Sequence, residues 1–172
     1  YAQDHPEVDY LHFWLDDRMN NTCECELCRH NRVADFYVMI LNGIDQQTWN
    51  PATDKYLVQN YDRDSLDKKL DNKLELQQRF GLKQDAKIPL IGFIGRLVEQ
   101  KGLDMIIQAL AELTSLPLQM VFLGSGQHHY QQSLLTAAEQ YPESVVAVIG
   151  YDEELSHQIE AGCDMFLMPS LF

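Results

Sequence analysis

Two cations lie five positions apart in a loop whose composition would suit a phosphate. Arg96 and Lys101 lie in the segment 95–102, which begins and ends with glycine and joins an apolar run to an amphipathic one. An arginine can hold phosphate oxygens with two parallel hydrogen bonds, a lysine adds a compact charge, and a helix N-terminus offers free N–H groups. The pair therefore indicates a pyrophosphate site. Spacing alone leaves open that both cations are solvated residues of a surface loop.

Three further loops follow apolar runs, and each carries residues suited to a nucleotide. Gly124 and Gly126 would let a ligand approach the backbone closely, but the third glycine of a dinucleotide fingerprint is absent and a plain tight turn explains them equally well. Tyr151 directly follows Gly150, so its ring stands where a base could stack, or where it could pack on the domain edge. Ser170 lies in the last of these loops.

The apolar runs and the stretches between them predict the elements that position these loops. From about residue 88 onward, short apolar runs that end in Gly or Pro alternate with amphipathic segments. Strands joined by helices pair in parallel, and ligands of such sheets bind beyond the carboxyl ends of the strands. The predicted fold class is therefore α/β, a Rossmann-like parallel sheet with flanking helices. The expected strands are 89–95, 118–124, 145–150 and 165–169, and the expected helices are 103–113, 129–141 and 152–162.

Upstream of these runs the pattern is less regular. Leu66, Leu70, Leu74 and Phe80 fall on roughly one face of a helix that a following glycine would end. The spacing therefore predicts a helix that packs through these four apolar side chains. Residues 36–41 predict a strand that runs into an Asn-Gly turn.

The N-terminal segment is polar and holds a cluster of cysteines. Cys23, Cys25, Cys28 and His30 form a C-x-C-x-x-C-x-H pattern whose thiolates and imidazole suit zinc. The spacing departs from paired-knuckle patterns, so reduced thiols in a loop are the default and no metal site is assigned. Cys163 is expected to be a small core residue.

The charge balance limits the partners. Thirteen Lys plus Arg against 26 Asp plus Glu give a net charge of -13, which would repel nucleic acid and acidic membrane surfaces. No apolar run approaches the ~20 residues that a membrane-spanning helix needs. Three of the four cysteines are bunched, unlike a secreted disulfide framework, so we expect a reducing compartment. A chain of 172 residues suits one domain of ordinary size, and its start at Tyr1 suggests a fragment edge.

At these residues the sequence resembles the bacterial glycogen synthases and plant starch synthases, retaining glycosyltransferases built from two Rossmann-like domains. The matching motifs are Asn42-Gly43-Ile44-Asp45, Trp49-Asn50-Pro51, Ala52-Thr53-Asp54, Asn72-Lys73, Leu76-Gln77, Gly81-Leu82, Gly95-Arg96-Leu97, Gln100-Lys101-Gly102, Leu123-Gly124-x-Gly126, Gly150-Tyr151-x-Glu153, Ser156-His157, Ala161-Gly162-x-Asp164 and Pro169-Ser170-x-Phe172. The resemblance implies a partial nucleotide-sugar-binding domain over 37–172, the C-terminal half of a glycosyltransferase-B architecture. Residues 1–36 remain an unassigned segment.

The resemblance also implies roles for single residues. Arg96 and Lys101 would be catalytic, holding the donor diphosphate and stabilising the charge that builds on the departing ADP. Tyr151 would stack on adenine. The residues expected to bind the donor are Gly95, Arg96, Lys101, Gly124, Gly126, Tyr151 and Ser170. His157 and Asp164 also fall on motif positions and are expected to be structural.

The activity that the resemblance implies is transfer of glucose from ADP-glucose to the non-reducing end of an α-1,4-glucan, with retention and without a cofactor or metal. The location would be the bacterial cytoplasm, or the plastid stroma of a plant or alga. In the family, the final motif continues into a Glu-Pro-x-Gly-Leu segment near the transferred sugar, and an N-terminal domain binds the acceptor. We therefore expect a truncated chain that is inactive alone. A non-catalytic nucleotide-binding module and a related glycosyltransferase that uses UDP-glucose stay open as alternatives.

Overall fold

The computed structural model describes residues 45–171, and its elements form one parallel α/β sheet with helices on both faces. All strand pairs are parallel and the sheet order is β3-β2-β1-β4. The strands are β1 Leu90–Ile94, β2 Gln119–Gly124, β3 Val145–Ile149 and β4 Met165–Phe166. The helices are α2 Lys69–Arg79, α3 Leu103–Leu113, α4 His128–Gln140 and α5 Glu153–Gly162, with 3-10 turns η2 Leu66–Lys68 and η3 Glu99–Lys101. The predicted fold class is confirmed.

Some predictions lie outside the described residues. These are the strand at 36–41, the domain boundary at residue 36 and the cluster of Cys23, Cys25, Cys28 and His30. The unit described here begins at Gln46. None of its helices has the length and apolar character needed to cross a membrane.

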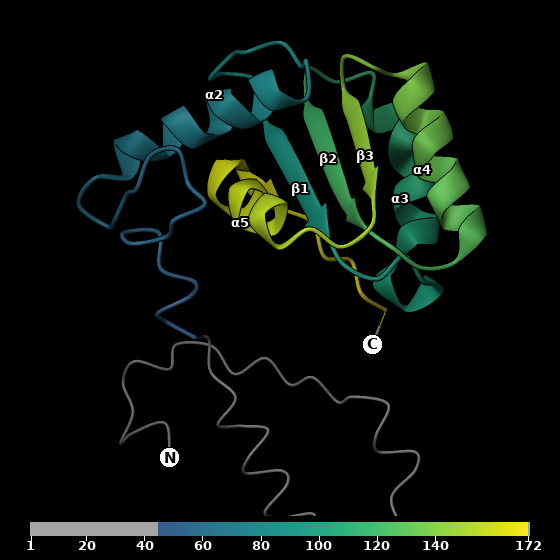
Figure 1. The fold of residues 1–172 in the computed structure, drawn as a ribbon. Helices are drawn as coiled ribbons and strands as arrows, with labels where there is room; N and C mark the ends of the chain where they lie inside the picture. Colours follow the sequence, from purple (N-terminus) through teal and green to yellow (C-terminus); the bar gives the residue numbers. More distant parts are fainter. Residues whose placement is uncertain (1–44, 172) are drawn as a thin grey trace, which may run out of the picture. The chain divides into compact units, whose positions relative to one another are not determined.

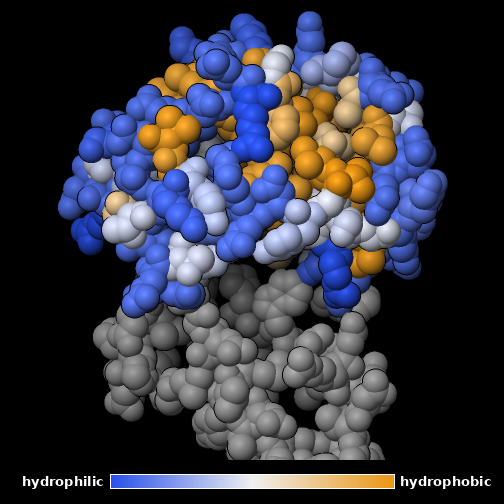
Figure 2. All heavy atoms as spheres, viewed as in Figure 1, coloured by the Kyte–Doolittle hydropathy of each residue, from blue (hydrophilic) through white to orange (hydrophobic). Residues whose placement is uncertain are grey.

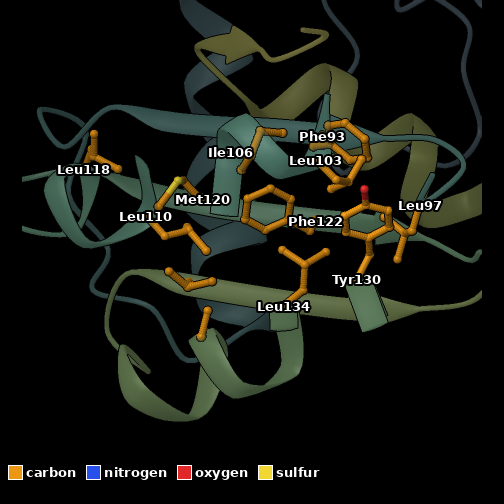
Figure 3. Packing of buried hydrophobic residues seen from close by; sticks show 12 residues of the cluster. Phe93, Leu97, Leu103, Ile106, Leu110, Leu118, Met120, Phe122, Tyr130 and Leu134 are labelled. Carbon is orange, nitrogen blue, oxygen red and sulfur yellow. The ribbon is translucent and has the colours of Figure 1, made fainter. Parts of the chain in front are cut away.

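One face of the sheet packs against α3 and α4 (Figure 1). The amphipathic character predicted for the helix 103–113 is confirmed, because Leu103, Ile106 and Leu110 of α3 are buried. They meet Phe93 of β1 and Phe122 of β2, whose rings lie 5.9 Å apart in a tilted arrangement (Figure 3). Every residue of β2 is buried, as expected of a central strand in a parallel sheet.

The other face packs against α2 and α5 (Figure 1). A side chain at Gly92 of β1 would meet Ile159 Cγ2 at 2.6 Å and Cys163 Sγ at 2.8 Å, so the glycine lets α5 lie close to the strand. Cys163 is a free, buried cysteine, as predicted, and burial raises the pKa of its thiol to about 12. Helices cover less of this face near β3, and hydrophobic residues are visible at the surface over β2 and β3 (Figure 1 and Figure 2).

The strand predicted at 165–169 is shorter and more exposed than expected. Only Met165 and Phe166 pair, both with β1, and both are exposed. Within the described sheet β4 is an edge strand with a paired neighbour on one side only, so it is not enclosed as β2 is. Leu167 continues the contact through its backbone N–H, which donates to Gly92 O at 2.8 Å.

The apolar face predicted for α2 is wrong in its first half, although Phe80 at its end is partly buried and packs against the cluster that contains Leu76. Leu66 belongs to η2 and is 59% exposed, and Leu70 is 40% exposed. The buried residues of α2 are Asn72, Lys73, Leu76 and Gln77, of which only Leu76 is apolar. The predicted end of the helix is confirmed by Gly81, whose φ of 66° allows Leu82 N–H to donate to Gln77 O at 2.9 Å.

Each buried polar side chain of α2 has a partner from a distant part of the chain. Lys73 Nζ donates to Asp164 Oδ2 at 2.6 Å and to Ala86 O at 2.9 Å. Gln77 Nε2 donates to Gln119 Oε1 at 2.7 Å. Because buried polar groups are costly unless they are hydrogen-bonded, these partners are what allow α2 to bury a polar face.

Candidate functional site

Loops from four strands meet at the carboxyl edge of the sheet. Gly95 N–H donates to Leu123 O at 3.0 Å, and Gly150 N–H donates to Gly124 O at 2.9 Å. A Cβ on Gly124 would lie 1.9 Å from Gly95 O, so the backbones after β1 and β2 touch with no room for a side chain. The first three predicted loops are therefore neighbours.

Gly126 fixes the second loop against the first. Leu97 and Gly126 form an isolated parallel bridge beyond the ends of β1 and β2. Leu97 N–H donates to Ser125 O and Gln127 N–H donates to Leu97 O, both at 2.8 Å. A Cβ on Gly126 would lie 2.3 Å from Leu97 O. The glycine is needed for this backbone contact.

The fourth loop is tied to the start of α3. Gly102 precedes α3 with a left-handed φ of 72°, and a Cβ there would lie 2.1 Å from Pro169 O. Leu171 N–H donates to Gln100 O at 2.9 Å. Between these contacts, Ser170 Oγ is buried and has no hydrogen-bond partner among the described residues. Its hydrogen-bonding capacity is therefore not used within the described residues.

The two predicted cations lie in the loop between β1 and α3. Arg96 is exposed, and its Nη2 lies 3.4 Å from Gln100 Oε1. Lys101 is only 8% exposed and ends the turn η3. Burial, and secondarily the charge of Arg96, lower the pKa of Lys101 below its usual 10.5. The two cations thus repel each other, and an anion near both would offset that repulsion.

Tyr151 is free to contact a ligand. Its side chain is 86% exposed, so the alternative that it packs on the domain edge is wrong. The preceding Gly150 has φ 147°, a value that favours glycine, and carries the chain from β3 to the cap of α5. Asp152 Oδ1 accepts from Leu155 N–H at 2.9 Å and so caps the N-terminus of that helix.

The other motif residues lie away from this edge. Asp164 Oδ2 accepts from Leu90 N–H at 2.7 Å at the amino end of β1, besides its pair with Lys73. His157 is buried on α5 and pairs with Asp54. Both arrangements support the structural roles expected for them. His128 and His129 are exposed at the start of α4.

The carboxyl edge combines loops whose backbones are in contact, two cations, a buried hydroxyl and an exposed aromatic ring. Close backbone and cations suit a diphosphate, and an aromatic ring suits a base. No group of three or more potential metal ligands occurs among residues 45–171. A groove of about 590 Å³ lies elsewhere, between α3 and α4, and none of the predicted site residues lines it.

Comparison with known proteins identifies the family. The family model for glycosyl transferases group 1 matches residues 72–172, more than half of the chain. The chain belongs to this family. The matched range contains all four loops of the carboxyl edge.

The relatives of this glycosyltransferase confirm the resemblance to glycogen and starch synthases. The chain is 56% identical over 133 residues to glycogen synthase of Cellvibrio japonicus and 50% identical over 133 residues to glycogen synthase 1 of Methylococcus capsulatus. These matches cover 77% of this chain but only 28% and 27% of the two relatives. The catalytic domain of starch synthase IV from Arabidopsis thaliana, bound to ADP and acarbose, superposes with a TM-score of 0.72 at 37% identity, over 84% of this chain and 31% of that one.

Two features of the glycosyltransferase edge were not predicted. One is the contact of Gly102 with Pro169, which joins the first and fourth loops. Gly102 ends the turn η3, a position where glycine often takes a positive φ, but nothing in the sequence names its partner. The other is the burial of the Ser170 hydroxyl. The sequence does not indicate whether a serine in a loop is exposed or buried.

Replacing Gly126 by alanine should destabilise the carboxyl edge. Its Cβ would strike the backbone at Leu97 O, which no rotamer change can relieve, so we expect a loss of about 1–3 kcal/mol of unfolding free energy. Ser125→Ala, one residue away and exposed, keeps the backbone bonds of the loop. It should change the free energy of unfolding by less than about 0.5 kcal/mol. Urea denaturation measures both. Equal values for the two variants would contradict the assigned contact.

Proposed function

We propose that this chain binds the ADP moiety of ADP-glucose at the carboxyl edge of its sheet. The observation that carries the proposal is the placement of Arg96 and Lys101 on one loop, with the charge of Arg96 lowering the Lys101 pKa. In a protein of net charge -13, the segment 95–102 holds two cations and one carboxylate, Glu99, and so carries a net positive charge beside a helix start. A net positive loop favours an anion, and a diphosphate supplies that charge.

Further contacts extend the proposed site beyond the phosphates. The backbone at Gly95, Gly124 and Gly126 has no side chains to hold a ligand away, and Tyr151 offers an exposed ring for adenine. Ser170 Oγ would donate to or accept from the donor. The ADP seen in starch synthase IV of Arabidopsis thaliana supports the choice of nucleotide.

The same cations would act on the reaction itself. In a retaining transfer the bond between the glucose carbon and the diphosphate oxygen breaks, and negative charge accumulates on the departing ADP. Arg96 and Lys101 would stabilise that charge more in the transition state than in the ground state, which is the condition for catalysis. They are therefore proposed as catalytic residues as well as binding residues.

The complete reaction is proposed for a protein that contains this chain together with the remaining regions of its relatives, because the chain spans only 28% of the Cellvibrio japonicus enzyme. That protein would transfer glucose from ADP-glucose to the non-reducing end of an α-1,4-glucan, with retention. The acceptor would bind outside the described residues. We place the protein in the bacterial cytoplasm, or in the plastid stroma of a plant or alga, as part of the same proposal.

Titration calorimetry with ADP tests the binding site. We expect measurable binding by the unmodified chain, and an affinity about 10- to 100-fold weaker in Arg96→Ala and in Lys101→Ala, since each removes a charge-assisted contact with a phosphate. The matched controls are Arg63→Ala and Lys87→Ala, which remove exposed cations outside the carboxyl edge. They should bind ADP as the unmodified chain does.

Two results of the same titration would contradict the proposal. Absence of ADP binding in a folded unmodified chain would remove the proposed site. Binding of UDP as tight as that of ADP would instead favour the alternative of a glycosyltransferase that uses UDP-glucose.

The affinity for ADP should fall as the pH rises towards 10. Lys101 binds the diphosphate in its charged form, and its pKa in the free protein lies below 10.5. The loss of affinity therefore begins below the pH at which an ordinary lysine titrates. Lys101→Arg stays charged throughout this range, so its affinity should be nearly constant. A pH profile of unmodified protein that matches that of Lys101→Arg would exclude a role for the Lys101 charge.

A chimera tests transfer. This chain would replace the corresponding region of the glycogen synthase of Cellvibrio japonicus, to which it is 56% identical. We expect the chimera to release ADP from ADP-glucose in the presence of glycogen. The Arg96→Ala chimera should be at least about 100-fold slower, because it lacks a contact made to the departing ADP. A folded chimera with no release above that of Arg96→Ala would contradict the proposed activity.

A further inference from the structure

The segment from Trp49 to Tyr61, called the strap from here on, folds back on itself ahead of α2. It contains neither helix nor strand. Tyr61 N–H donates to Pro51 O at 3.2 Å, so the two ends of the strap meet. The side chain of Asn60 donates to Pro51 O at 3.0 Å and to Asp54 O at 2.8 Å. The strap is thus a compact loop with its own internal bonds.

The strap adds almost nothing to the apolar core. Neither hydrophobic cluster of the described residues has a member from the strap. Between residues 46 and 62 the one buried residue is Asp54, a carboxylate. The free energy that keeps the strap in place must therefore come mainly from polar and ring contacts rather than from apolar burial.

Those contacts centre on His157 of α5. His157 Nδ1 and Asp54 Oδ2 lie 2.5 Å apart, with the two side chains 1% and 7% exposed. The indole of Trp49 stacks on the imidazole at 3.8 Å between centroids and 3° between planes. The ring of Tyr56 lies 5.0 Å away and tilted. One imidazole of α5 thus contacts three side chains of the strap.

A second set of bonds joins the strap to both helices through side-chain amides. Asn72 of α2 accepts from Gln59 N–H at 3.2 Å and donates to Gln59 O at 2.7 Å. Gln158 Nε2 of α5 donates to Tyr56 O at 3.1 Å. Hydrogen bonds of this kind add little net stability, because water replaces them when the strap leaves.

The docked strap also carries a cost. His157 Nε2 is buried without a hydrogen-bond partner among the described residues. Docking removes Nε2 from water without giving it a partner, and an unmet buried polar atom is unfavourable. Undocking would return Nε2 to water. The Asp54–His157 pair therefore stabilises the docked state, while the unpartnered Nε2 of the same imidazole destabilises it.

We propose that the strap is a latched segment that undocks from α2 and α5 as a unit while the sheet stays folded, and that the Asp54–His157 pair beneath Trp49 is the latch. The two hydrophobic clusters, which contain no strap residue, remain intact in the undocked state. The proposal does not depend on nucleotide binding.

Hydrogen exchange of the whole chain tests this directly. In the unmodified protein the strap amides should exchange through an opening of lower free energy, and of weaker urea dependence, than the amides of β1 and β2. Asp54→Asn and His157→Phe should each speed strap exchange by at least about 100-fold, since each removes one partner of a buried pair, and should leave β1 and β2 protected. The second variant keeps a ring beneath Trp49.

Matched controls separate the latch from a general loss of stability. Asp64→Asn removes an exposed carboxylate just beyond the strap, and His128→Phe replaces an exposed histidine of α4. Neither should change strap exchange. The proposal is overturned if strap and strand amides open together in the unmodified chain. It is also overturned if a latch variant speeds the strap no more than its control, or if that variant loses the protection of the strands.

The fluorescence of Trp49 gives a second readout. Trp14→Phe leaves Trp49 as the remaining tryptophan, since the chain has two. In this background, His157→Phe and Asp54→Asn should raise the accessibility of the indole to acrylamide. Unchanged quenching in both would contradict undocking.

Discussion

Backbone contact between glycines at the carboxyl edge sets the shape of the whole candidate site. Gly95 and Gly124 touch, Gly126 pairs with Leu97, and Gly102 meets Pro169. In each case a Cβ would fall within 2.3 Å of a carbonyl oxygen, which no real side chain allows. A parallel sheet brings loops to one edge, but only such contacts make them a single surface.

One loop of that surface, the segment 95–102, carries a net positive charge in an acidic chain. The sequence carries twice as many acids as bases, yet the loop after β1 holds Arg96 and a largely buried Lys101. Burial and the nearby charge of Arg96 both disfavour the charged form of Lys101, and its pKa is lowered accordingly. Under the proposed function, a bound diphosphate would offset the repulsion between the two cations while it forms new bonds with them.

The sequence predicts those parts of the molecule that local patterns encode. Apolar runs located β1, β2 and β3, because a strand buried on both faces must be apolar throughout, and the loops that follow them contain the proposed site. The buried face of α2 was not predictable in this way. Its residues are polar and depend on partners distant in sequence, such as Asp164 for Lys73. The same holds for Asp54 and His157, which lie 103 positions apart. For the site, residue types predicted the loop of Arg96 and Lys101, but only the fold joins Gly102 to Pro169.

The two ends of the sheet differ in how tightly their parts are held. At the amino end, Asp164 binds both Lys73 and the backbone of β1, and Gln77 binds Gln119, so polar side chains fasten α2 to the strands. At the carboxyl edge an exposed ring and a buried hydroxyl have no such partners among the described residues. A binding site requires groups whose contacts are not already made within the protein, held in place by packed elements, because those contacts can then be made with a ligand. A stable amino end therefore lets the carboxyl edge keep groups that contribute little to folding.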